Sequence, residues 1–182
     1  MSAHDAALSS YGQTKLVVEQ SLDPRRDLVI RPGFVIGPGG VFGRLVQMIR
    51  SLPVIPLFYG GRQRIQTIHI EDLLVGILKA LETDQVGLLL LGEESPVMLR
   101  EFYGQIATLA GRKKPMIPVP GFLALALLRM AEVFRMRLPF TTENLLGLKQ
   151  LRSFDVRDSL RVLDLKPRTM RESLEDQKWI KS

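Results

Sequence analysis

The chain has 182 residues, of which 46% are hydrophobic and 24% charged, so it is long enough for a globular domain with a substantial core. It contains no cysteine, which excludes disulfides, thiolate catalysis and cysteine-ligated metal sites. The net charge of +6 is spread out: residues 1–60 contribute +2 (six basic against four acidic) and the remainder +4 (19 against 15). Such a spread favours a solvated basic surface, so we expect no nucleic-acid partner.

The sequence has no feature of a secreted or membrane-spanning protein. Its first residues are polar and lack the basic and apolar regions of a signal peptide. The most apolar segment, Gly121–Phe134, contains Arg129 and Glu132 and is shorter than the ~20 apolar residues of a membrane-spanning helix. We interpret it as a core helix, with an interfacial or partner-binding helix as the alternative. No transmembrane segment and a cytoplasmic location are therefore expected.

Helical and extended patterns alternate over the first two-thirds of the chain, which predicts an α/β fold with a parallel sheet. In chain order we expect a helix over 11–21, a strand over 28–31, a proline- and glycine-rich loop over 31–40, a helix over 41–52, a short strand over 54–59, a strand over 67–70, a helix over 71–82 and a central strand within 87–91. Glu71 and Asp72 open their helix where its dipole favours carboxylates.

The last third is mostly helical. We expect a helix over 96–109, an extended piece over 116–119, a helix over 121–134, another beginning near Thr141, one within 155–163 and a last helix that ends near Ser173. Pro167-Arg168-Thr169 should cap that last helix.

Tyr11 and Lys15 form the motif that could carry chemistry. Residues four apart on a helix share a face, with Cβ atoms about 5–6 Å apart. An ammonium that close favours the phenolate, so the tyrosine could exchange a proton with a carbon-bound oxygen during hydride transfer. The lysine could also donate hydrogen bonds to ribose hydroxyls. The alternative is a surface aromatic beside a surface lysine.

Three ordered stretches resemble the extended short-chain dehydrogenases/reductases, the NAD-dependent epimerase/dehydratase family. They are the Tyr11/Lys15 helix, the strand that runs into Arg31-Pro32-Gly33-Phe34-Val35-Ile36-Gly37-Pro38, and Gln66-Thr67-Ile68-His69-Ile70-Glu71-Asp72-Leu73. The last stretch and the helical tail look closest to the atypical branch that includes the complex I accessory-subunit-like proteins.

This resemblance implies the C-terminal half of a Rossmann-type parallel sheet with a small, mostly helical substrate-binding subdomain. Residues 1–37 and 66–92 would belong to the NAD(P)-binding domain, and residues 38–65 and 93–182 to the substrate-binding subdomain.

The resemblance also implies roles for individual residues. Tyr11 would be the acid/base, and Lys15 would tune it and hold the nicotinamide ribose of NAD or NADP. His69 would be structural rather than catalytic, and Asp72 a helix N-terminal carboxylate. No residue is expected to bind a metal. The set expected to contact the cofactor is Tyr11, Lys15, Pro32, Gly33, Phe34 and Val35.

Two parts of the family pattern are missing. The glycine-rich Gly-x-x-Gly-x-x-Gly turn that binds the diphosphate does not occur, and no serine or threonine stands about a dozen residues before Tyr11. We therefore expect a fragment that binds NAD(P) weakly or not at all and that pairs with a missing N-terminal half or with a second copy.

Two functions stay open from the sequence. One is a fragment of an NAD(P)-dependent oxidoreductase, epimerase or dehydratase acting on a small molecule, either nucleotide-linked or quinone-related. The other is a non-catalytic subunit with the same fold and a structural or assembly role.

Overall fold

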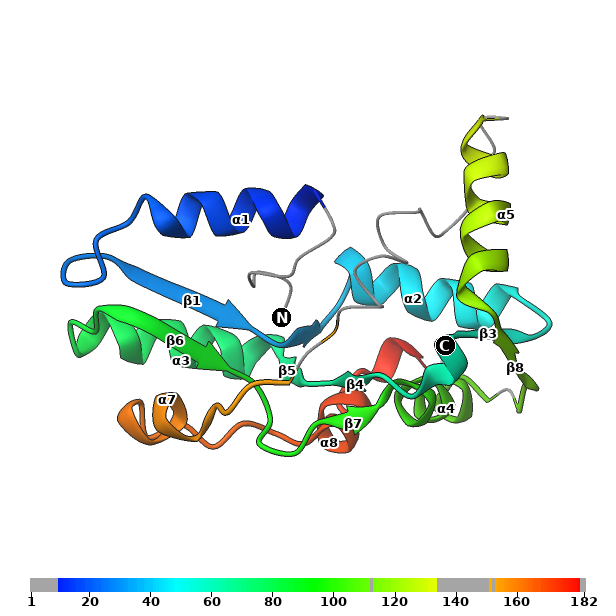
Figure 1. The fold of residues 1–182 in the computed structure, drawn as a ribbon. Coiled ribbons are helices and arrows are strands. Elements are labelled where there is room, and N and C mark those ends of the chain that lie inside the picture. Colours follow the sequence, from blue (N-terminus) through cyan, green and yellow to red (C-terminus); the bar gives the residue numbers. More distant parts are fainter. Residues whose placement is uncertain (1–9, 112, 134–150, 152, 181–182) are drawn as a thin grey trace.

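The computed structural model describes residues 10–111, 113–133, 151 and 153–180, shown in Figure 1. In chain order the elements are α1 (Ser10–Gln20), β1 (Leu28–Pro32), β2 (Phe34–Ile36), α2 (Gly40–Ser51), β3 (Ile55–Phe58), the 3-10 turn η1 (Tyr59–Gly61), β4 (Arg64–Ile65), β5 (Thr67–His69), α3 (Ile70–Glu82), β6 (Gly87–Leu91), β7 (Val97–Met98), α4 (Leu99–Leu109), β8 (Met116–Val119), α5 (Gly121–Val133), α7 (Arg157–Val162), α8 (Met170–Glu175) and η2 (Lys178–Ile180).

Parallel strand pairing dominates, as the alternation of helices and strands predicts. β1 pairs with β6, β2 with β5 and β3 with β8, all in parallel, whereas β4 and β7 pair antiparallel. The three strands expected near 28–31, 67–70 and 88–91 are confirmed as β1, β5 and β6. The α/β fold with a parallel sheet is therefore confirmed.

Helices cover the β1–β6 pair on both faces. The alternating side chains of the two strands show which helix lies on which face. Leu28, Ile30, Leu89 and Leu91 pack in one apolar cluster with α3 and α7. Arg31 instead contacts Glu19 of α1. Because successive side chains of a strand point to opposite faces, α1 lies on the face opposite α3, and Figure 1 shows it running alongside β1.

A second apolar cluster joins α2, α4 and α8. Phe42 and Phe102 lie at its centre, and the ring of Phe34 packs edge-on against both, with centroids 6.4 and 5.6 Å away. The ring of Trp179 closes the cluster at 5.8 Å from Phe42. Through Phe34, β2 is thus packed against the helices of this cluster.

The structure differs from the predicted elements in three places. The expected loop over 31–40 contains a strand, β2, because Phe34 and its neighbours pair with β5. The helix expected from 96 begins at Leu99, because Val97–Met98 pairs with β4. β6 pairs with β1 alone among the described strands, and its Leu88 is 47% exposed, so it is not the central strand that its apolar run indicates.

Two further expectations concern the helical tail. α7 and α8 confirm the helices expected within 155–163 and after Thr169, and Thr169 forms a capping box with Glu172. The helix expected near Thr141 lies outside the described residues. Among the residues that the structure describes, no helix is long and apolar enough to cross a membrane.

Candidate functional site

α1 carries both members of the predicted catalytic pair. Tyr11 and Lys15 lie one turn apart on this helix, as their spacing predicts, and the Lys15 side chain is exposed. The side chain of Tyr11 lies outside the part that the structure describes, so its expected direction, toward the loop after Ile30, stays a prediction.

An ion pair connects α1 to the strand that leads into the expected cofactor loop. Arg31 Nε donates to both carboxylate oxygens of Glu19, at 3.0 and 2.9 Å, and Arg31 Nη2 also contacts Glu19. Both side chains are largely buried, whereas Val17 and Val18 of the same helix are exposed. The Glu19–Arg31 pair therefore joins the C-terminal part of α1 to β1.

The Pro32–Val35 segment crosses from β1 to β2 at a very close strand approach. A Cβ added to Gly33 would lie 2.5 Å from the carbonyl oxygen of Gln66, so only glycine fits. The N–H groups of Gly33 and Phe34 donate to Leu91 and Gln66, both at 2.7 Å. Both N–H groups are already hydrogen-bonded within the sheet, so a nicotinamide would have to contact other backbone atoms of the segment.

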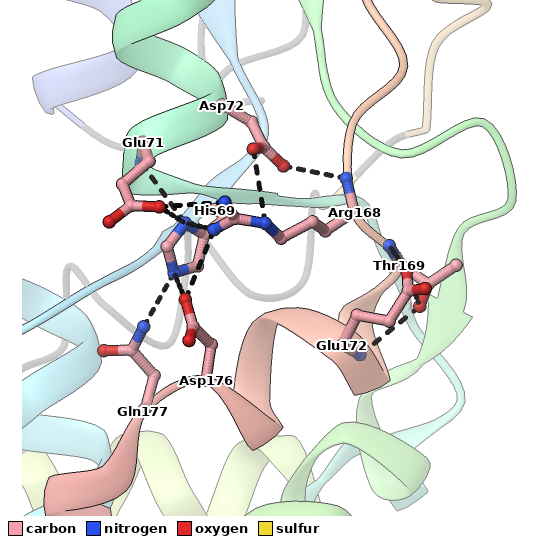
Figure 2. Close-up of polar contacts among 8 residues, drawn as sticks. All are labelled: His69, Glu71, Asp72, Arg168, Thr169, Glu172, Asp176 and Gln177. Atoms are coloured by element: carbon pink, nitrogen blue, oxygen red, sulfur yellow. Dashed lines mark hydrogen bonds and ion pairs between the residues drawn. The ribbon is translucent and has the colours of Figure 1, made fainter.

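His69 ends β5 and is buried. Its Nδ1 accepts the backbone N–H of Glu71 at 3.3 Å and so caps α3, and Arg168 Nη1 lies 2.5 Å from the same nitrogen, as Figure 2 shows. Because a guanidinium can only donate, Nδ1 is the acceptor in this contact. Nε2 faces Asp176 Oδ2 at 3.4 Å and the Gln177 amide nitrogen at 2.8 Å.

Arg168 occupies the centre of an acidic cluster. Its Nη2 donates to Glu71 at 2.8 Å, its Nη1 to Asp176 at 3.3 Å, and its backbone N–H to Asp72 at 2.7 Å. The hydrogen bond that the Arg168 guanidinium donates to Glu71 raises the pKa of Arg168. His69, Glu71 and Asp176 offer ligand atoms within 4.8 Å of one another, but Arg168 lies among them and supplies the positive charge.

His69 and Asp72 therefore have structural roles, as the sequence analysis expected. Together with Arg168 they clamp the segment before α8 onto the N-terminus of α3. These contacts join the C-terminal segment to β5 and α3.

Two buried polar residues were missed by the sequence analysis. Glu93, in the loop after β6, accepts hydrogen bonds from Thr67 Oγ1 at 2.8 Å and from the backbone N–H of Met170 at 3.0 Å. Burial raises its pKa in spite of these bonds. Gln66 donates to the carbonyl oxygens of Glu93 and Phe154, at 2.9 and 3.0 Å. In the sequence, Glu93 and Gln66 are marked only by being polar residues beside apolar strands.

A groove of about 310 Å³ lies at the beginning of β1 and β6, beside the end of α1. Its lining residues are Glu19, Gln20, Leu22, Pro24, Asp27, Val29, Gly87 and Leu88. In open α/β sheets ligands bind at the opposite, carboxyl ends of the strands, where Pro32 and Leu91 lie. The groove is therefore separate from the predicted cofactor loop.

Parallel strands with helices on both faces place the chain in the Rossmann-type α/β class, and its fold is that of the extended NAD(P)-dependent epimerases and dehydratases. A human epimerase family protein, SDR39U1, solved with NADPH, is similar with a TM-score of 0.66 at 23% identity, over 85% of this chain and 48% of that one. UDP-glucuronic acid 4-epimerase from Bacillus cereus, solved with UDP-glucuronic acid and NAD, is similar with a TM-score of 0.62 at 18% identity. The match covers 100% of this chain and 57% of that one.

RMD from Pseudomonas aeruginosa, solved with NADPH, gives a TM-score of 0.62 at 17% identity, over 98% of this chain and 58% of that one. The chain thus spans about half the length of these solved structures. No protein-family model matches the sequence, and no curated protein matches it.

Proposed function

We propose that this chain forms part of an NAD(P)-dependent oxidoreductase, epimerase or dehydratase of the short-chain dehydrogenase type. The observation that carries the proposal is the placement of Tyr11 and Lys15 one turn apart on α1, a helix that the Glu19–Arg31 pair anchors to β1, in a chain with this fold. Solved neighbours with the same fold are complexes with NADPH or NAD.

In this proposal Tyr11 exchanges the proton of the substrate oxygen, and NAD(P), when bound, supplies or accepts the hydride. Lys15 donates to the ribose hydroxyls and favours the ionised form of the tyrosine. The Pro32–Val35 segment lies at the carboxyl end of β1, where a nicotinamide would bind. The substrate class is a small molecule, nucleotide-linked or quinone-related.

The cofactor fits this chain only in part. Lys15 and the 32–35 segment suit the nicotinamide end, but the sequence has no glycine-rich turn for the diphosphate. We therefore propose that the diphosphate site lies outside these 182 residues.

We also propose that residues 1–37 and 66–92 form the dinucleotide side, and residues 38–65 and 93–182 the substrate side. The cluster that joins α2, α4 and α8 supports this division. α7 departs from it, because this helix packs against β1 and β6 on the dinucleotide side.

Calorimetric titration with NADH and NADPH tests whether the chain binds only the nicotinamide end of the cofactor. The 182-residue chain should bind either dinucleotide orders of magnitude more weakly than a complete enzyme, because several charge-assisted hydrogen bonds to the diphosphate, each worth about 1.5–3 kcal/mol, are not made. A low-micromolar dissociation constant would show that this chain holds a complete site.

The catalytic roles are tested in a protein that also contains the glycine-rich half. Tyr11→Phe should reduce kcat at least about 100-fold and leave dinucleotide affinity unchanged, because only the proton transfer is lost. Lys15→Met should weaken dinucleotide binding and lower kcat together. Unchanged turnover in Tyr11→Phe would contradict the acid/base role.

A non-catalytic, structural subunit is the second candidate, and α5 favours it. Phe122 on this helix is 78% exposed, and Leu123 and Met130 are also exposed. If the role is structural, Phe122→Asp should disrupt an assembly, while Tyr11→Phe should have no effect on it.

A further inference from the structure

The antiparallel ribbon of β4 and β7 has one face in the core and one face in solvent. Arg64 pairs with Met98, and Ile65 pairs with Val97. Ile65 and Val97 pack in the cluster that joins α2, α4 and α8. Because successive side chains of a strand point to opposite faces, Arg64 and Met98 lie on the outer face, and both are exposed. Figure 1 shows β7 running from this ribbon into α4.

Two further exposed arginines, Arg62 and Arg100, lie beside each other at the end of the ribbon. The N–H of Leu99 donates to the carbonyl of Gln63 at 2.9 Å, which continues the strand pairing toward both arginines. A Cβ added to Gly61 would lie only 2.9 Å from the Cβ of Arg100, so Arg100 packs against the residue that directly precedes Arg62. Together with Arg64, these two residues form what we call the arginine cluster.

The arginine cluster is unfavourable for the stability of the protein without a ligand. Like charges on adjacent strands repel, and none of the three guanidinium groups has a carboxylate partner among the described residues. Arg100 is also the second residue of α4, where the helix dipole disfavours a cation. The turn before Arg62 contains Tyr59 with a φ of 52°, which a bulky residue adopts only with strain. Local features that oppose stability are typical of functional sites.

We infer that the arginine cluster binds an anionic ligand that carries two adjacent phosphate groups. A guanidinium donates two parallel hydrogen bonds to a phosphate, and two phosphate groups carry a charge of about −3 to −4 near neutral pH, which matches three arginines. A single carboxylate would leave most of the positive charge of the cluster uncompensated. None of the three arginines belongs to α1 or to the 32–35 segment, so this site goes beyond the proposed function and does not depend on it.

Calorimetric titration of the complete 182-residue chain with inorganic pyrophosphate tests the inference, with sulfate at the same ionic strength as the reference anion. One pyrophosphate should bind per chain, at least about tenfold more tightly than sulfate, because its two phosphate groups contact the three guanidinium groups together. Arg100→Glu should weaken pyrophosphate binding at least about tenfold. Arg26→Glu is the matched control, since Arg26 is an exposed arginine in the turn before β1 and its replacement changes the net charge equally. It should leave the affinity unchanged.

Thermal unfolding without a ligand is a second measurement on the same two variants. Arg100→Glu should raise the melting temperature, because it relieves the repulsion from Arg62 and Arg64 and places an acidic residue in the first turn of α4. Arg26→Glu should not raise it. A cooperative transition in each variant also shows that a loss of pyrophosphate binding does not come from unfolding.

Adjacent phosphate groups occur in free metabolites and in lipid headgroups, and co-sedimentation with vesicles distinguishes these two sources. The probe vesicles contain phosphatidylcholine and a phosphatidylinositol bisphosphate, and the reference vesicles carry the same charge as phosphatidylserine. Preferential binding to the probe vesicles would assign the site to a lipid headgroup, and binding of pyrophosphate without vesicle binding would assign it to a free ligand. Two results would overturn the inference: neither probe binds more tightly than its reference, or Arg100→Glu weakens binding no more than Arg26→Glu.

Discussion

The side-chain amide of Gln66 forms both hydrogen bonds of a strand rung with the backbone of Phe154: it donates to the carbonyl at 3.0 Å and accepts from the N–H at 3.1 Å. The same amide donates to the carbonyl of Glu93 at 2.9 Å. Gln66 is buried between β4 and β5, so these contacts join the start of β5 to a segment 88 residues later.

Replacement of Gln66 by leucine should therefore destabilise the protein by about 3 kcal/mol, because buried backbone groups would lose their partners. Gln47, which is exposed on α2, provides the control: Gln47→Ala should change stability by less than about 0.5 kcal/mol. Urea unfolding followed by circular dichroism measures both. Equal stabilities of the two variants would contradict a role for the Gln66–Phe154 rung.

Gly33→Ala should disrupt the close approach of β1 and β2 to β5. A Cβ would lie 2.5 Å from the Gln66 carbonyl oxygen, so the strands must move apart, at a cost of about 3 kcal/mol. Gly43→Ala is the matched control, because a Cβ there meets nothing within 4 Å and alanine favours the helix by about 1 kcal/mol. The two substitutions should shift the melting temperature in opposite directions, and a stabilised Gly33→Ala would refute the steric argument.

Glu93 should make stability fall as pH rises. Burial raises the pKa of its carboxyl group above the usual 4.5, so the folded state holds the proton more tightly than the unfolded chain. That contribution is fully present below pH 4.5 and is lost as pH rises through the raised pKa. The unfolding free energy of wild type minus that of Glu93→Gln should therefore decrease over this range in urea titrations. A difference that increases with pH would show that the hydrogen bonds to the carboxylate outweigh burial.

Arg168→Gln should release the segment before α8 from α3. The guanidinium bridges Glu71, Asp72 and Asp176, and its loss should cost about 2 kcal/mol. Arg157→Gln removes an exposed ion pair with Asp155 and should change stability by no more than about 0.5 kcal/mol. The rate of limited proteolysis between α7 and α8 is a second measurement of this release. Cleavage there should accelerate in Arg168→Gln and stay unchanged in Arg157→Gln.

Local patterns were sufficient to predict most helices and the three main strands. Apolar periodicity, the carboxylates Glu71 and Asp72, and the Thr169 cap act within one or two turns, so they can be read from neighbouring residues. β2 was missed because Pro32 and Gly33 indicate a turn, whereas Gly33 serves a close approach to a strand 33 residues later. The apolar run of β6 predicted a strand but could not reveal which of its edges is paired.

The candidate site was predictable only where its members are close in sequence. The spacing of Tyr11 and Lys15 predicts a shared helix, and α1 contains both. His69, Gln66 and Glu93 each have a partner far along the chain, namely Arg168, Phe154 and Met170, which lie 99, 88 and 77 residues away, where periodicity and caps carry no information. Arg168, which completes the acidic cluster, stands in a capping sequence that indicated only the helix after it.

These long-range contacts also affect how the chain folds during synthesis. Residues Gln66, His69 and Glu93 leave the ribosome well before Phe154, Arg168 and Met170, their partners in the folded state. Until those residues emerge, the nascent chain holds polar groups among apolar strands that cannot yet be satisfied, so β5 and β6 should stay loosely packed. The stretch from 154 to 180 therefore completes the core last, and a chain that stops before it would lack part of both apolar clusters.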